Sequence, residues 1–250
     1  MSNVAFGFTV PMSLGRILTT SFRQGIICLN KGNLTSNVRV GTGNANGPTF
    51  TTTGSTITQN NANPASSNWS SVSPLVLRNT GASYLSTPVS SLLVPGLSYG
   101  VNSGSFRFYM NTVSTTRSQI LLFCGTASTG IAFFIFTNRL LYIQANGVAS
   151  YQVSASVISP TTWYHIDYRQ AATGFLVYVN GTLSLTISGW APNGVANASD
   201  PFALLGNPVN TSLWSDAYMT DVVSSYGTNY LTTAIVPQFT PSIYVNASWK

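Results

Sequence analysis

The chain has 250 residues, of which 44% are hydrophobic and only 6% are charged, against about 25% charged in ordinary soluble domains. Its net charge of +6 comes from four acids, all of them aspartates, against ten bases that are scattered singly along the chain. Because nucleic-acid binding uses clustered Lys and Arg to neutralise phosphates, this pattern argues against a nucleic-acid partner.

The first 72 residues are predicted to form an N-terminal arm and a polar linker. Residues 1–32 are moderately apolar but are interrupted by Pro11 and Gly15, whereas residues 33–72 are rich in Asn, Thr, Ser and Gly. Such a polar tract is typical of a loop, or of irregular strands that need partners. Two interpretations stay open: a disordered linker, and an arm that becomes ordered in an assembly.

Strand patterns recur from residue 75 onward, with turn residues between them. Residues 105–111 alternate, so that Phe106, Phe108 and Met110 share one face of a strand. The runs 119–124 and 131–136 are continuously apolar, which is typical of strands covered on both faces. Further strands are predicted at 75–77, 82–85, 139–145, 150–157, 202–206 and 217–223, and a tail strand at 242–245 as a partner for the arm.

Alternation returns between residues 163 and 169. Tyr164, Ile166 and Tyr168 form the apolar set of this strand. The intervening side chains, on the opposite face, are Trp163, His165, Asp167 and Arg169.

A β-hairpin follows directly. Two alternating runs, 175–179 and 182–187, are joined by Asn180-Gly181. This dipeptide is the strongest short hairpin signal, because a type I′ turn needs φ > 0 at both central residues. The whole pattern predicts an all-β fold over residues 73–227, an antiparallel two-sheet sandwich with almost no helix, followed by a C-terminal extension over 228–250. We expect its core to include Phe106, Phe108, Ile166, Tyr168, Val177 and Leu185.

The order of these elements is similar to that of a known family. The segment Thr162-Trp163-Tyr164-His165-Ile166, followed by Leu176-Val177-Tyr178-Val179-Asn180-Gly181, carries most of the similarity. Shorter matching pieces lie at 84–88, 105–110, 202–207 and 218–222. Residues 83–223 thus resemble laminin-G-like, concanavalin A-type lectin-like domains of the LamG/pentraxin group. The resemblance implies a jelly-roll, binding of carbohydrate or protein rather than catalysis, and in some members calcium. Related modules of low charge occur on phage and large-virus particles.

We expect no enzymatic activity. Glycoside hydrolysis needs two carboxyl groups about 5–10 Å apart, and this chain has no Glu and no Asp-x-Asp motif. His165 and Asp167 share one face of a strand, but no Gly-x-Ser-x-Gly elbow supplies a nucleophile. The sequence therefore favours a polar ladder of His165, Asp167 and Arg169 on a sheet face.

We expect no cofactor and no metal. Calcium needs six to eight oxygen ligands, usually with two or more carboxylates. Asp200, Asp216 and Asp221 are weak calcium candidates, since Asp216 and Asp221 would face opposite sides of a regular strand. Thr220 also stands where the similar family commonly has Asp.

Exposed aromatic side chains are the candidate ligand-binding residues, because aromatic rings stack on sugars and neutral amides bind sugar hydroxyls. Four lie in a polar context rich in turn residues: Trp69, Trp190, Trp214 and Tyr226. The alternative is that they cover the core or touch a neighbouring subunit.

The two cysteines, Cys28 and Cys124, do not make a disulfide framework. Cys124 ends an apolar run and is predicted to be a small buried hydrophobic residue. Whether the two thiols pair is left open.

The preferred functional prediction is a structural surface protein of a virion, as a capsid-associated, decoration or fibre component. Residues 1–32 would attach it to other subunits or to further copies of itself, because so many apolar side chains seldom stay in water. The alternative is a lectin-like module that binds glycans on a host or cell surface. The expected location is the virion surface or outside the cell, because a composition typical of outside surfaces, without a secretory signal, fits a virus structural protein that assembles inside its host. We find no apolar run of the roughly 20 residues that span a membrane.

Overall fold

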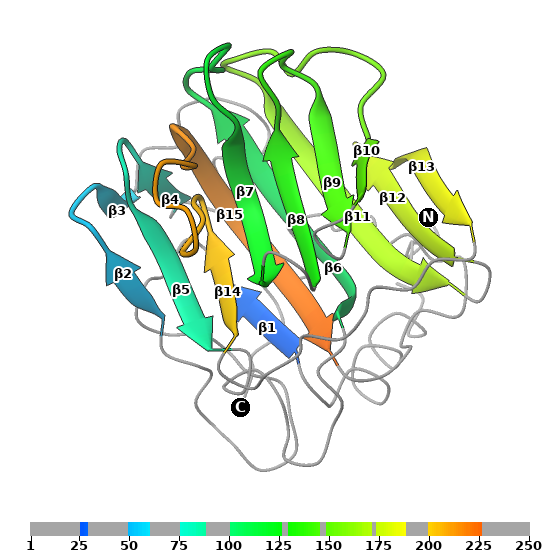
Figure 1. The fold of residues 1–250 in the computed structure, drawn as a ribbon, viewed down its shortest axis with the longest axis horizontal. Coiled ribbons are helices and arrows are strands. Elements are labelled where there is room, and N and C mark those ends of the chain that lie inside the picture. Colours follow the sequence, from blue (N-terminus) through cyan, green and yellow to red (C-terminus); the bar gives the residue numbers. More distant parts are fainter. Residues whose placement is uncertain are drawn as a thin grey trace, which may run out of the picture.

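The computed structural model describes residues 26–29, 50–60, 76–88, 101–126, 130–145, 149–171, 174–188 and 200–226. Over these residues the protein is built from 15 strands and contains no helix. The strands pair in antiparallel fashion into two sheets that lie face to face (Figure 1). The predicted fold class, an antiparallel two-sheet jelly-roll sandwich, is confirmed.

The sheet at the back of Figure 1, here sheet A, has eight strands. Seven form a continuous order: β13 (Thr182–Ser188), β12 (Gly174–Val179), β11 (Trp163–Ala171), β6 (Val101–Met110), β15 (Ala217–Tyr226), β4 (Val76–Asn79) and β3 (Ile57–Asn60). The eighth, β1 (Ile26–Leu29), pairs with the C-terminal half of β15, whereas β4 pairs with its N-terminal half.

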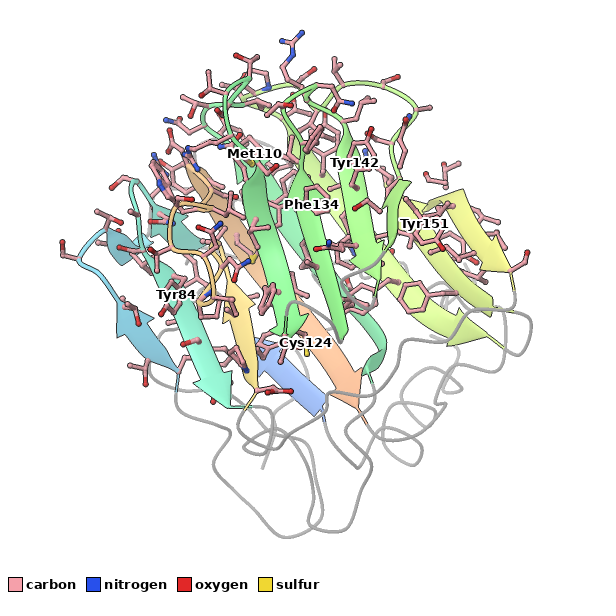
Figure 2. All side chains as sticks on the ribbon, viewed as in Figure 1. Tyr84, Met110, Cys124, Phe134, Tyr142 and Tyr151 are labelled. Carbon is pink, nitrogen blue, oxygen red and sulfur yellow. The ribbon has the colours of Figure 1, made fainter. Side chains whose placement is uncertain are left out.

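The front sheet, here sheet B, has seven strands. Their order is β10 (Ala149–Gln152), β9 (Leu141–Ala145), β8 (Gly130–Ile135), β7 (Gln119–Gly125), β14 (Pro201–Leu204), β5 (Tyr84–Pro88) and β2 (Thr51–Thr53). Figure 2 shows Tyr84, Phe134 and Tyr142 on strands of this sheet.

The core lies between the sheets and is built from the alternating apolar positions. Phe106 and Phe108 of β6 and Ile166 and Tyr168 of β11 are fully buried and pack in one cluster with side chains of sheet B. The predicted core residues Val177 and Leu185 belong to the same cluster, Leu185 as a partly buried member. Cys124 is also buried there, as predicted.

The predicted hairpin forms between β12 and β13. Asn180 has φ 51° and Gly181 has φ 81°, as a type I′ turn requires. The Asn180 side chain also ties the turn to β11, because its Oδ1 accepts a hydrogen bond from the His165 backbone N–H at 2.8 Å. This second contact fixes the hairpin against the strand that carries His165.

The sandwich begins earlier in the chain than the predicted boundary at residue 73. Strands β1, β2 and β3 all lie within residues 1–72 and pair with β15, β5 and β4. Phe50 and Ile57 are buried, and Phe50 packs edge-to-face on Phe202 with ring centroids 6.1 Å apart. These strands have only three or four residues, too few for alternation to separate them from a polar loop.

Some predictions fall outside the described part of the chain. The tail strand at 242–245 lies there, as does the side chain of Cys28, so the question of a Cys28–Cys124 pair stays open. Within the described residues, no helix has the length and hydropathy needed to cross a membrane.

Candidate functional site

The outer face of sheet A, which points away from the core, carries the charged side chains of Arg78, Arg107 and Asp167 on three of its strands. On β6 it carries Ser105, Arg107 and Tyr109, which alternate with the core residues of that strand and are themselves no more than 6% exposed. On β11 the register sets Asp167, His165 and Trp163 opposite these three residues, in that order. Two alternating sets of side chains thus form one layer on the outer side of sheet A, in which Asp167, like its partners on β6, is buried, whereas His165 and Trp163 are partly exposed.

An aromatic row runs across three strands of this face. Trp163 on β11 and Tyr218 on β15 are both in register with Tyr109 on β6. The ring centroids of Trp163 and Tyr109 are 5.6 Å apart, and those of Tyr109 and Tyr218 are 5.7 Å apart. Tyr109, in the middle, is only 6% exposed, whereas the two outer rings are half-buried.

Arg78 on β4 continues the row beyond Tyr218. Its Cζ lies 4.6 Å from the centroid of the Tyr218 ring, and its Nη2 lies 2.6 Å from Oδ1 of Asp216. Its Nη1 donates to the backbone carbonyls of Asn79 and Ala217. The guanidinium is therefore held near the sheet backbone by a carboxylate and two carbonyls.

A polar cluster lies on the same face, on β6 and β11. Nε2 of His165 lies 2.8 Å from Oγ of Ser105 and 3.3 Å from Oδ1 of Asp167. In a catalytic triad, the nucleophile and the carboxylate face different nitrogens of the imidazole. Here both face Nε2, so the arrangement of Ser105, His165 and Asp167 does not match that of a triad.

The calcium candidates do not come together in the described structure. Asp200 directly precedes β14, near the C-terminal end of the neighbouring strand β7. Asp216 lies near the N-terminal end of β7, because the adjacent Ser215 donates a hydrogen bond to the carbonyl of Ile120. Asp216 is already bound by Arg78 and accepts a hydrogen bond from Oγ1 of Thr112 at 2.8 Å. The Asp221 side chain lies outside the described residues, and those residues contain no group of three or more His, Cys, Asp or Glu side chains placed to hold a metal.

Of the four aromatic candidates from the sequence, the structure describes one side chain. Trp214 lies beneath the guanidinium of Arg117, whose Cζ is 3.8 Å from the ring, and its carbonyl accepts a hydrogen bond from Arg117 Nη1. Burial lowers the pKa of Arg117, and the carboxylate of Asp216 opposes that shift. Trp214 thus joins two loops, 111–118 and 205–216. Trp69, Trp190 and the side chain of Tyr226 lie outside the described residues.

Sequence reasoning missed the aromatic row. The alternation of residues 105–111 puts Tyr109 opposite the apolar face of its strand, and Trp163 was placed on the polar face of residues 163–169. The signal that joins them is the pairing of β6 with β11. Tyr218 and Arg78 could be added only once β15 was known to lie between β6 and β4. A face of a sheet is recognised only when the order of its strands is known.

A second aromatic group lies on sheet B. Phe134 and Tyr142 stack with centroids 5.7 Å apart, and Phe136 packs against both and is 44% exposed. None of the ion pairs described in the structure involves this group. It offers a matched control surface for the aromatic row.

Comparison with known proteins adds information on the fold alone. No protein-family model and no curated protein matches the sequence. Among solved structures, the chain is similar to domain 4 of AbnA, a GH43 extracellular arabinanase from Geobacillus stearothermophilus, determined in complex with arabinotriose. The TM-score is 0.55 and the identity 15%, over 88% of this chain and 95% of that domain.

Two further similar structures are larger proteins. Trypanosoma rangeli sialidase gives a TM-score of 0.53 at 12% identity, over 82% of this chain and 31% of the sialidase. A botulinum neurotoxin type C structure, from work on cell entry through two ganglioside molecules, gives 0.54 at 14% identity, over 84% of this chain and half of that one. The chain therefore shares a two-sheet jelly-roll sandwich fold with these structures, and it spans about a third and a half of these two larger proteins.

Proposed function

We propose that this protein is a non-catalytic, lectin-like module that binds a neutral glycan on the outer face of sheet A. The aromatic row of Trp163, Tyr109 and Tyr218 is the observation that carries this proposal. Sugar rings present apolar C–H faces that stack on aromatic rings, while their hydroxyl groups bind neighbouring polar side chains. Beside the row, the partly exposed imidazole of His165 is the polar group that such a hydroxyl can reach, whereas Ser105 and Asp167 are buried.

The composition of the chain supports a neutral ligand. Only 6% of the residues are charged, and Arg78, the cation in contact with the row, is paired with Asp216. A charged ligand would need an unpaired opposite charge at the row to replace its hydration. The structural neighbours agree with a sugar ligand, since one was determined with arabinotriose and another concerns gangliosides.

The absence of catalysis is part of the proposal. It is supported by the lack of Glu in the sequence, and by Ser105 and Asp167 facing the same nitrogen of His165. We also propose that the chain belongs to the laminin-G-like group of concanavalin-like domains. This part of the proposal is supported by the similarity of residues 83–223 to that group.

A glycan array followed by calorimetry tests the proposal. The full chain should bind at least one class of neutral oligosaccharide, and Trp163→Ala and Tyr218→Ala should each weaken that binding. Phe136→Ala, which removes an exposed ring from sheet B, is the matched control and should leave binding unchanged. A folded protein that binds no glycan, or whose binding is lost only in the Phe136 variant, would refute the assignment to sheet A.

A second and more specific proposal is the one predicted from the sequence, that this module is a structural component of a virion. Its argument rests on residues 1–32, of which the structure describes only β1, and β1 pairs with β15 of the sandwich. Deleting residues 1–25 removes the arm as far as β1 and leaves that strand in place. If the arm is an assembly device, the native mass falls from an oligomer to a monomer while the fold persists. A full chain that is itself a stable monomer counts against assembly.

A further inference from the structure

The spacing of the outward-facing rings defines what kind of glycan the row accepts. Trp163 and Tyr218 lie on strands β11 and β15, which flank β6 on opposite sides. Two neighbouring strand spacings separate them, which places their backbones about 10 Å apart. Tyr109, between them, is nearly buried. The row therefore offers two accessible rings with a filled gap, rather than one continuous aromatic platform.

The Arg78 guanidinium contacts one face of the Tyr218 ring and also donates to the backbone carbonyls of Asn79 and Ala217. The opposite face of the ring is the one that a ligand would approach. Because the Arg78 guanidinium is bound to the sheet backbone, it lies beneath the Tyr218 ring. The burial of the two residues agrees with this placement, since Arg78 is buried and Tyr218 is partly exposed. The ion pair with Asp216 thus supports the Tyr218 ring from below.

The aromatic contacts described for the row join rings on neighbouring strands, so they run across the strands. Two residues further along β6 and β11, on the same face, stand Arg107 and His165, and beyond them Ser105 and Asp167. A chain laid along the strands would leave the rings after one sugar unit and find no further accessible ring, because Arg107, Ser105 and Asp167 are buried there. A chain laid across the strands meets Trp163, passes over Tyr109 and reaches Tyr218.

Resting on the function proposed above, we propose that the site binds an extended, unbranched oligosaccharide of at least three units that lies across the strands. Alternate units stack on Trp163 and Tyr218, because alternate units of an extended chain are separated by about two strand spacings. The middle unit lies over Tyr109. A disaccharide reaches only one of the two outer rings, so three units are the shortest chain that uses both.

A length series tests this proposal on the unmodified protein. Arabino-, xylo- and cello-oligosaccharides of two to five units are titrated by calorimetry. For the class that binds, we expect the trisaccharide to bind about fivefold or more tightly than the disaccharide, since it gains a second ring contact. Longer chains should add little beyond the trisaccharide.

Single-ring variants then locate the effect. Trp163→Ala and Tyr218→Ala should each abolish the advantage of the trisaccharide. The disaccharide should lose no more than about twofold in each, because one ring remains. The double variant should lose both ligands, and Phe136→Ala should match the unmodified protein. A thermal melt of each variant shows whether it is still folded, so that loss of binding is not confused with loss of the fold. The length series on the unmodified protein does not depend on any variant.

The possible failures are distinct. If no glycan binds, the proposed function itself fails. If glycans bind but affinity does not depend on length between two and three units, or if compact branched glycans bind as well as extended ones, the function stands and the extended-chain site is wrong. A trisaccharide advantage that survives in both single variants would also overturn it.

Discussion

The guanidinium of Arg78 lies between the carboxylate of Asp216, at 2.6 Å, and the ring of Tyr218, at 4.6 Å from its centroid. One side chain thus links the end of β4, the start of β15 and the aromatic row. Because both ion-pair partners are largely buried, removing one of them leaves an uncompensated charge with little access to water.

Arg78→Met should therefore destabilise the fold by about 3 kcal/mol and should also weaken glycan binding, since Tyr218 loses its support. Urea unfolding measures the first effect and calorimetry the second. Arg139→Met removes an exposed arginine and should change stability by no more than about 0.5 kcal/mol. Equal effects in the two variants would show that the Arg78–Asp216 pair contributes nothing specific.

Two glycines of the β12–β13 hairpin should respond very differently to alanine. At Gly181, φ is +81° and nothing lies within 4 Å of an added Cβ, so Gly181→Ala meets only the backbone penalty of about 1 kcal/mol. At Gly174, φ is +146° and the Cβ would lie 2.1 Å from the carbonyl oxygen of Ile187.

Gly174→Ala should therefore cost more than about 3 kcal/mol and should abolish cooperative folding if the hairpin is integral to sheet A. Urea unfolding monitored by tryptophan fluorescence compares the two variants. A Gly174 variant as stable as the Gly181 variant would mean that β13 does not hold this register against β12 in solution.

The sequence predicted the long strands that have one face on the core, because apolar and other side chains alternate along them. Strands β6 and β11 alternate over seven residues, and the Asn180-Gly181 turn admits one backbone conformation, so these elements lay within reach of local rules. The short edge strands β1, β2 and β3 were hidden, because their place is decided by the strands that they complete.

The site lay at the limit of what sequence can predict. His165 and Asp167 were correctly placed on one face, because they are two residues apart on a strand. Ser105, which completes their cluster, comes from β6, 60 residues earlier. The row from Trp163 to Arg78 needs the order of four strands, and that order depends on long-range packing rather than on local alternation.

Trp214 provides a test of the difference between a structural and a binding aromatic. Its ring stacks on Arg117 and holds two loops together, so Trp214→Ala should lower stability by about 1–2 kcal/mol. Glycan affinity should change less than about twofold, because the ring lies outside the row. Calorimetry on the folded variant decides the matter, and a loss of affinity as large as that of Trp163→Ala would restore Trp214 as a ligand-binding residue.

The cluster of Ser105, His165 and Asp167 gives the sharpest test of the non-catalytic proposal. Activation of a serine requires a base that accepts its proton while a carboxylate orients the base through its other nitrogen. Here Oδ1 of Asp167 and Oγ of Ser105 both approach Nε2, at 3.3 and 2.8 Å, and Ser105 is 2% exposed. A fluorophosphonate probe should therefore leave Ser105 unmodified, as read by mass spectrometry of the intact protein.

The same preparation should show no turnover of neutral oligosaccharides, chitin or simple esters. The Asp167→Asn variant keeps the size of the side chain and removes its charge, so it should bind glycans normally if the carboxylate has no chemical role. Turnover that disappears in this variant, or a probe adduct on Ser105 that disappears in His165→Ala, would make the cluster an active site. Turnover and a probe adduct both require a chemical reaction at the cluster. A protein that only binds glycans would give neither result, because binding transfers no group to Ser105 and cleaves no bond.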